Sequence, residues 1–218
     1  MGKRVAVVLS GCGVYDGAEI HESVLTLLQL EKNAAQVQAF APDVMQAHVV
    51  NHLSGEVTEE AQRNALVESA RIMRGNVKPL NEASADDFDA LIVPGGFGAA
   101  KNLSDFAFAG ADLKVNADFL DFARAMHKAN KPIGLICIAP AMTAAIFGEG
   151  ASCTIGNDAD TAAAIEKTGA KHIICSVDDI CVDEANKLVT TPAYMLANSI
   201  VEAATGIGKL VDQVVAMA

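Results

Sequence analysis

The chain has no Trp, only two Tyr and few aromatic residues overall, 5% of its 218 residues. Hydrophobic residues nevertheless make up 51% of the chain, and Ala, Val and Ile are plentiful. Small and β-branched apolar residues are typical of a parallel sheet that is buried between helices. The length suits one large domain, so we expect residues 1–218 to form a single α/β domain.

Positive charge is also scarce. There are 16 Lys and Arg against 27 Asp and Glu, which gives a net charge of −11. Proteins that bind nucleic acid or anionic membrane surfaces need clustered Lys and Arg. We therefore expect neither nucleic acid nor membrane as a partner. The uninterrupted apolar runs are also far too short to span a bilayer.

Cysteine patterns that bind metal are absent. The five cysteines include no Cys-x-x-Cys pair and no Cys/His cluster with zinc spacing, so we expect no metal. The first four residues lead directly into a predicted strand rather than into a cleavable apolar segment. An odd number of cysteines without such a segment indicates free thiols in a reducing compartment, and we expect a cytoplasmic protein.

Strand and helix patterns alternate along the chain, which predicts a mostly parallel sheet with helices on both faces. The predicted strands are Val5–Leu9, Val37–Phe40, Val77–Leu80, Ala90–Val93, Ile133–Cys137 and an antiparallel pair within Ile173–Thr190. The predicted helices are Glu19–Glu31, Glu59–Met73, Val115–Ala129, Pro140–Phe147, Thr161–Lys167, Met195–Thr205 and Lys209–Met217. In the first helix the side chains expected to face the core are Val24, Leu25, Leu27, Leu28 and Leu30.

The most informative stretch is residues 131–141, Lys-Pro-Ile-Gly-Leu-Ile-Cys-Ile-Ala-Pro-Ala. A buried strand that ends on Cys137 and is followed by small residues and a helix is typical of a nucleophile elbow. The N-terminus of the following helix favours negative charge, which would lower the pKa of the thiol. Cys137 is therefore the candidate nucleophile. The alternative interpretation is that Cys137 is a small apolar core residue.

Glu22 is the candidate acid–base residue. It lies about one turn into the helix after the first strand, where the carboxyl ends of parallel strands converge. A carboxyl group held there beside a thiol could share a proton with it. The alternative is that Glu22 only stabilises the helix dipole. His21 is adjacent in sequence, but neighbouring helix positions diverge by about 100°, so we expect it to line the site at most.

Two loops could supply the remaining groups. Residues 94–96, Pro-Gly-Gly, directly follow a buried strand, and backbone N–H groups of Gly95 and Gly96 could stabilise an oxyanion. The second donor of an elbow is the residue after the nucleophile, here Ile138. The loop after the first strand is expected to border the site, which makes Cys12 and Gly13 candidate lining residues. Asn102, in the loop after the Gly-Gly turn, is a further candidate.

Together these stretches resemble the PfpI/class I glutamine amidotransferase-like superfamily. The resemblance lies in Glu22 within residues 17–24, in residues 93–98 and in residues 134–137. More narrowly, residues 10–17, 51–56, 137–141 and 191–196 resemble the ElbB-type family of isoprenoid-biosynthesis glyoxalases, the enhancing lycopene biosynthesis proteins. The resemblance implies a flavodoxin-like fold, Cys137 at the elbow and Glu22 hydrogen-bonded to it. It also implies a homodimer, because relatives commonly dimerise.

The resemblance further implies a cofactor-independent glyoxalase that converts glyoxal, or a similar 2-oxoaldehyde, to a 2-hydroxy acid. We classify the expected activity as hydro-lyase type. One departure matters: many relatives have a histidine directly after the nucleophile, whereas this chain has Ile138. No triad histidine is evident near residues 190–192 either, which makes amide hydrolysis less credible. The alternative function is a thiol-based sensor of oxidative stress or a regulatory binding protein without turnover.

Overall fold

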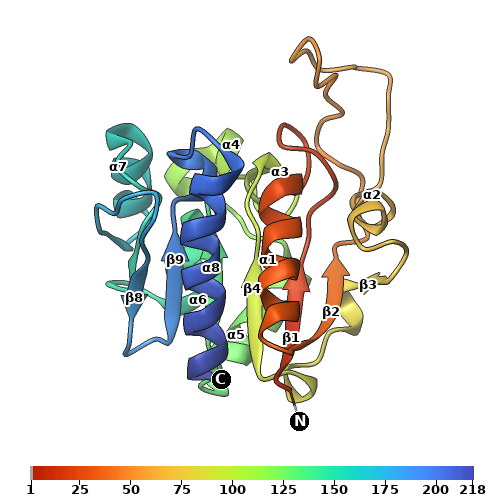
Figure 1. Ribbon diagram of the computed structural model, residues 1–218. Coiled ribbons are helices and arrows are strands. Elements are labelled where there is room, and N and C mark those ends of the chain that lie inside the picture. Colours follow the sequence, from red (N-terminus) through yellow and green to blue (C-terminus); the bar gives the residue numbers. More distant parts are fainter. Residues whose placement is uncertain (1) are drawn as a thin grey trace.

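The computed structural model describes residues 2–218 and contains a seven-stranded sheet between two layers of helices (Figure 1). The sheet is parallel except at one edge, where the last strand in order is antiparallel to its neighbour. Its strands, in spatial order, are β3 (Val77–Pro79), β2 (Gln36–Ala41), β1 (Arg4–Val8), β4 (Ala90–Val93), β5 (Ile133–Ile136), β9 (Leu188–Thr191) and β8 (Cys181–Asp183). This is the flavodoxin-like α/β architecture expected from the sequence.

Alternating residues of the central strands enter two separate hydrophobic cores. In β1, Val5 and Val7 face one core, whereas Ala6 and Val8 face the other. The first core packs against α1 (Ile20–Lys32), α2 (Ala65–Ile72) and α8 (Ile200–Met217). The second packs against α5 (Ala117–Lys128), α6 (Thr143–Phe147) and α7 (Ala159–Lys167). Burial on both faces explains why the central strands are continuous apolar runs.

Four further elements, two helices and two strands, were not expected from the sequence. Two short helices, α3 (Phe97–Lys101) and α4 (Phe106–Ala109), lie between β4 and α5. A small two-stranded parallel sheet pairs β6 (Ser152–Cys153) with β7 (Lys171–His172). All of these segments are too short to give a clear periodic pattern. No helix within residues 2–218 has the length and apolarity needed to cross a membrane.

The predicted inward face of α1 is wrong in two positions. Val24 and Leu28 are 48% and 45% exposed, although both were expected to face the core. The buried positions of this helix are Glu22, Ser23, Thr26 and Leu30. Apolar residues surround most of this helix, so hydrophobicity alone does not mark the buried side. Three polar side chains occupy that side instead, and one of them belongs to the site described below.

Other predicted boundaries change for identifiable reasons. Helix α2 begins six residues later than predicted, because the Asn64 side chain caps it by accepting a hydrogen bond from the Val67 N–H at 3.1 Å. The two predicted C-terminal helices form one helix, α8, that continues through Gly206 and Gly208. The predicted antiparallel pair is limited to β8 and β9, joined by a turn in which Asp183 accepts hydrogen bonds from Asn186.

Candidate functional site

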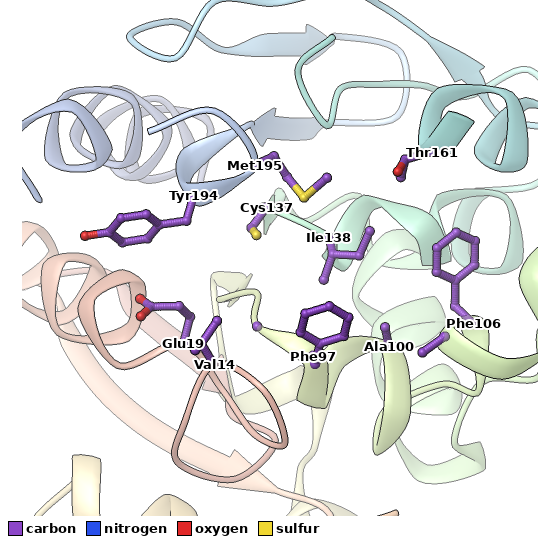
Figure 2. A pocket seen from close by; sticks show the side chains of 12 residues that line it. Val14, Glu19, Phe97, Ala100, Phe106, Cys137, Ile138, Thr161, Tyr194 and Met195 are labelled. Atoms are coloured by element: carbon purple, nitrogen blue, oxygen red, sulfur yellow. The ribbon is translucent and has the colours of Figure 1, made fainter. Parts of the chain in front are cut away.

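The site lies where the carboxyl ends of four neighbouring strands, β1, β4, β5 and β9, meet. Binding sites of open α/β sheets are generally found at this edge. The connections after these strands supply Glu19, Gly96, Cys137 and Tyr194, which all line one cavity (Figure 2). Residues more than 170 positions apart in sequence are therefore brought together by the strand order.

Cys137 directly follows β5 in a strained backbone conformation. Its φ angle is +63°, which is unusual for a residue with a Cβ atom and costs about 1–3 kcal/mol. The Cys137 N–H donates to the Thr191 carbonyl at 3.0 Å, which holds the turn against β9. A 3₁₀ helix, Ala139–Met142, begins immediately afterwards. This strand, strained turn and helix form the nucleophile elbow expected from the sequence.

Glu22 is fully buried and is held by backbone donors from two loops. One carboxyl oxygen, Oε2, accepts from the Gly95 N–H at 2.9 Å. The other, Oε1, accepts from the Tyr194 N–H at 3.2 Å. The same carboxyl group is hydrogen-bonded to the Cys137 thiol. The structure thus places Glu22 and Cys137 in direct contact.

The pKa of the Glu22 carboxyl is raised to about 7, mainly by burial and also by the nearby charge of Glu19. The hydrogen bonds from Tyr194, Cys137 and Gly95 oppose this shift. A carboxyl group with a pKa near neutrality can accept and return a proton under physiological conditions. The expectation that Glu22 has a raised pKa is therefore met, with desolvation as the main cause.

The pKa of the Cys137 thiol differs from the expectation. Burial and the adjacent Glu22 charge raise it well above its ordinary value, although the Gly96 and Ile138 N–H groups lower it in part. The following helical segment is short and begins as a 3₁₀ turn, so its dipole does not offset these effects. Cys137 therefore rests as a thiol, and a proton acceptor is needed to activate it.

Two of the three predicted oxyanion donors point at the sulfur. The N–H groups of Gly96 and Ile138 both hydrogen-bond to Cys137. The Gly95 N–H is not available, because it donates to Glu22. Gly95 instead permits close approach, since a Cβ at this position would overlap the Cys137 side chain. Its role in this geometry is to orient the carboxyl group rather than to stabilise an oxyanion.

The cavity at Cys137 has a volume of about 300 Å³ and an almost entirely apolar wall. Figure 2 shows Cys137 between Tyr194 and Glu19 on one side and Ile138, Phe97 and Phe106 on the other. The lining residues are Val14, Glu19, Gly96, Phe97, Ala100, Phe106, Ala107, Cys137, Ile138, Thr161, Tyr194 and Met195. Cys137 itself is 7% exposed and lines this cavity, through which a reactant can approach it.

The four residues predicted to line the site do not line this cavity. Cys12 lines a separate cavity of about 410 Å³, together with His52 and Arg63. Gly13 belongs to the same loop, where its φ of +142° and the adjacent His52 ring leave no room for a Cβ. The prediction for these two positions is wrong because, of loop residues 10–17, only Val14 lines the cavity at Cys137.

Asn102 and His21 have structural contacts instead. The Asn102 amide donates to the carbonyl oxygens of Ser10 and Asp16 at 2.8 and 2.9 Å, which fixes the loop after β1. The Nδ1 atom of His21 lies 2.8 Å from the Tyr194 hydroxyl, at the outer side of the site. His21 thus contacts a lining residue without lining the cavity itself.

Five important lining residues were missed by the sequence analysis. Tyr194 and Met195 lie in the stretch 191–196 that carried the resemblance, so a signal for them existed. Phe97 directly follows the Gly-Gly turn. Phe106 and Thr161 lie in α4 and α7, and no motif in their sequence neighbourhood indicates a role in the site.

Within residues 2–218 no group of three or more His, Cys, Asp or Glu side chains is arranged to hold a metal.

Comparison with known proteins places these features in a family. The model of the DJ-1/PfpI family matches residues 4–202. A human protein, glutamine amidotransferase-like class 1 domain-containing protein 3, is 49% identical over 97% of this chain and 82% of its own length. The crystal structure of an isoprenoid biosynthesis protein with an amidotransferase-like domain from Ehrlichia chaffeensis is 36% identical, covers 99% of both chains and has a TM-score of 0.92.

A more distant likeness concerns the fold alone. Glyoxalase III from Candida albicans is 16% identical, covers 99% of this chain and 97% of its own, and has a TM-score of 0.61.

The comparisons also correct the expected cytoplasmic location. The human relative and the ES1 proteins from Rattus norvegicus and Danio rerio are all named as mitochondrial, so the cytoplasmic prediction is wrong. The match over residues 4–202 and the relatives at 36–49% identity show that this chain belongs to the DJ-1/PfpI family.

Proposed function

We propose that this protein is a cofactor-independent glyoxalase of the ElbB type that converts a 2-oxoaldehyde to a 2-hydroxy acid. The observation that carries the proposal is the buried Glu22 carboxyl hydrogen-bonded to the thiol of Cys137, which lines a mostly apolar cavity. Membership of a family that includes glyoxalase III supports it. A link to isoprenoid biosynthesis is supported by the name of the Ehrlichia relative.

In the first step Cys137 sulfur adds to the aldehyde carbon. The thiol proton moves to the Glu22 carboxylate. The carbonyl oxygen accepts hydrogen bonds from the Gly96 and Ile138 N–H groups until Glu22 passes that proton to it, which restores the carboxylate. The product is a hemithioacetal. This order of steps does not need a free thiolate at rest, which agrees with the raised pKa of the Cys137 thiol.

In the second step Glu22 moves a proton between the two substrate carbons. As a carboxylate it removes the C–H proton of the hemithioacetal carbon, which gives an enediol, and it then returns a proton to the neighbouring carbon. The aldehyde carbon is thereby oxidised to a thioester and the neighbouring carbonyl is reduced to an alcohol. Water cleaves the thioester, which releases the 2-hydroxy acid and restores the thiol. The net reaction adds one water and balances without an external oxidant.

Two substitutions test the proposal. General acid–base catalysis contributes about 10²–10⁴-fold, so Glu22→Gln is expected to lower kcat/KM for glyoxal by at least about a hundredfold. Cys137→Ala is expected to abolish turnover, because no covalent intermediate can form. Product is measured as glycolate in a buffer without Tris, since Tris consumes aldehydes.

Cys12→Ala is the matched control, because Cys12 lines a different cavity. It is expected to retain wild-type kcat/KM. Turnover that survives in Cys137→Ala would refute the proposal.

The alternative, a thiol-based sensor, is less well supported. Redox-sensing thiols are accessible and have a low pKa. Cys137 is 7% exposed, and its pKa is raised rather than lowered. Glutamine hydrolysis is also less well supported, because a mostly apolar cavity offers few partners for a zwitterionic amino acid.

A further inference from the structure

The cavity at Cys137 is larger and more apolar than glyoxal requires. Glyoxal has only a handful of non-hydrogen atoms, and every part of it is polar or reactive. A water molecule occupies about 30 Å³ of liquid, so a cavity of about 300 Å³ has the volume of about ten waters. Glyoxal bound at Cys137 would leave most of this volume and most of the apolar wall unused.

Glu19 and the aromatic side chains of Phe97 and Phe106 lie on opposite sides of Cys137 (Figure 2). The groups that act on a carbonyl, the Cys137 thiol and the Gly96 and Ile138 N–H groups, converge on one point. Phe97, Ile138 and Phe106 lie on the other side of Cys137 from Glu19 and Tyr194 (Figure 2). The charged carboxyl group of Glu19 is therefore not on the side where an extended substituent would bind.

We infer that the preferred substrate is a 2-oxoaldehyde with an uncharged apolar substituent of several carbons, which binds among Phe97, Phe106, Ile138 and Met195. This inference rests on the proposed function, because it assigns the aldehyde end to Cys137. The aldehyde carbon bonds to sulfur, and the substituent on the neighbouring carbonyl carbon extends along the apolar wall. A substrate with a carboxylate is disfavoured, since no cationic side chain lines the described cavity and its one acidic lining residue is Glu19.

The reaction on such a substrate is the one described above with an alkyl chain added. The C–S bond forms, the proton moves from the aldehyde carbon to the neighbouring carbon through Glu22, and water releases the acid. The alkyl chain takes no part in the chemistry. Its contribution is binding, and burial of apolar surface raises kcat/KM by up to about fourfold for each methylene that fits.

A series of straight-chain 2-oxoaldehydes tests the inference. Glyoxal, methylglyoxal and 2-oxooctanal are compared at equal concentrations of the unhydrated aldehyde, with the hydroxy acid as the measured product. In the wild type, kcat/KM for 2-oxooctanal is expected to exceed that for methylglyoxal by at least about tenfold, the lower end of what several buried methylenes supply. A ratio near one would overturn the inference and leave the proposed function intact.

Two variants locate the apolar site on α4. Phe106→Ala removes part of the wall, and Ala107→Leu fills the cavity from an exposed position at its edge. Each is expected to lower the ratio of kcat/KM for 2-oxooctanal to kcat/KM for methylglyoxal by about tenfold. Phe108→Ala is the matched control: Phe108 is on the same helix but is 56% exposed and does not line the cavity.

The possible results separate the two claims. If both lining variants lower the ratio and Phe108→Ala does not, the inference is supported. If the wild type prefers 2-oxooctanal but neither lining variant changes the ratio of the two kcat/KM values, the alkyl chain of the substrate binds elsewhere and the inference is wrong. If no aldehyde is converted by the folded wild type, the proposed function itself is refuted, and the inference falls with it.

Discussion

Glu22 keeps its proton at a pH where an ordinary glutamate has lost it, because the fold removes it from water beside a second carboxyl group. Its position relative to the strand ends could be predicted from the sequence. Its complete burial could not, because burial depends on Tyr194 and Gly95, which lie far away in the chain. The raised pKa of the Cys137 thiol could not be predicted for the same reason. It results from burial and from Glu22, which is distant in sequence, and not from the helix that follows Cys137.

The pH dependence of turnover follows from the Glu22 pKa of about 7. The carboxylate is the active form, so kcat/KM is expected to fall about tenfold per pH unit below 7 and to level off above it. Initial rates between pH 5.5 and 8.5, corrected for the uncatalysed reaction, measure this profile. Glu19→Gln removes a charge that raises the Glu22 pKa, so the inflection is expected to move to lower pH. A flat profile in the wild type would contradict the role of Glu22.

Helix α8 shows why two C-terminal helices were wrongly predicted from the sequence where the structure has one. Gly206 and Gly208 have low helix propensity and suggested a break, yet the helix continues through both. The reason is packing, because a Cβ on Gly206 would lie 2.6 Å from both Thr191 Oγ1 and the Val177 carbonyl oxygen. The glycine therefore permits close contact between α8 and β9. The buried side of helix α1 was predicted wrongly for a related reason, since that side carries polar residues, among them Glu22 of the site.

Substitution of these two glycines is expected to have opposite effects. Gly206→Ala forces atoms apart and should lower the free energy of unfolding by about 1–3 kcal/mol. A Cβ on Gly208 meets only Gln29 atoms at 3.8 Å or more, so Gly208→Ala should raise the free energy of unfolding by about 0.5–1 kcal/mol. Denaturant unfolding of both variants measures the difference. Equal effects of the same sign would show that α8 does not pack as described.

At the scale of the whole molecule, the order of strands creates the site. The apolar runs and their alternation with helices were sufficient to predict the parallel sheet, and the elbow was recognisable within it. The wall of the cavity was not predictable in this way. Phe106 and Thr161 come from α4 and α7, and only the three-dimensional packing brings these elements to Cys137. The chemistry of the site could thus be predicted from the sequence better than its selectivity, since selectivity depends on contacts between residues that are distant in the chain.

Four of the five thiols should react with iodoacetamide in an order set by their exposure and pKa. Cys12 is half-buried with a raised pKa, whereas burial and the Asp179 charge raise the pKa of the half-buried Cys175 to about 11. Cys153 is fully buried. Alkylation depends on the exposed thiolate, so Cys12 is expected to react first, Cys175 later and Cys153 only on unfolding. Peptide mass spectrometry over time at pH 8 measures the order. Cys137 should be slow, and if it reacts fastest, the thiol is ionised at rest and the sensor function becomes the better explanation.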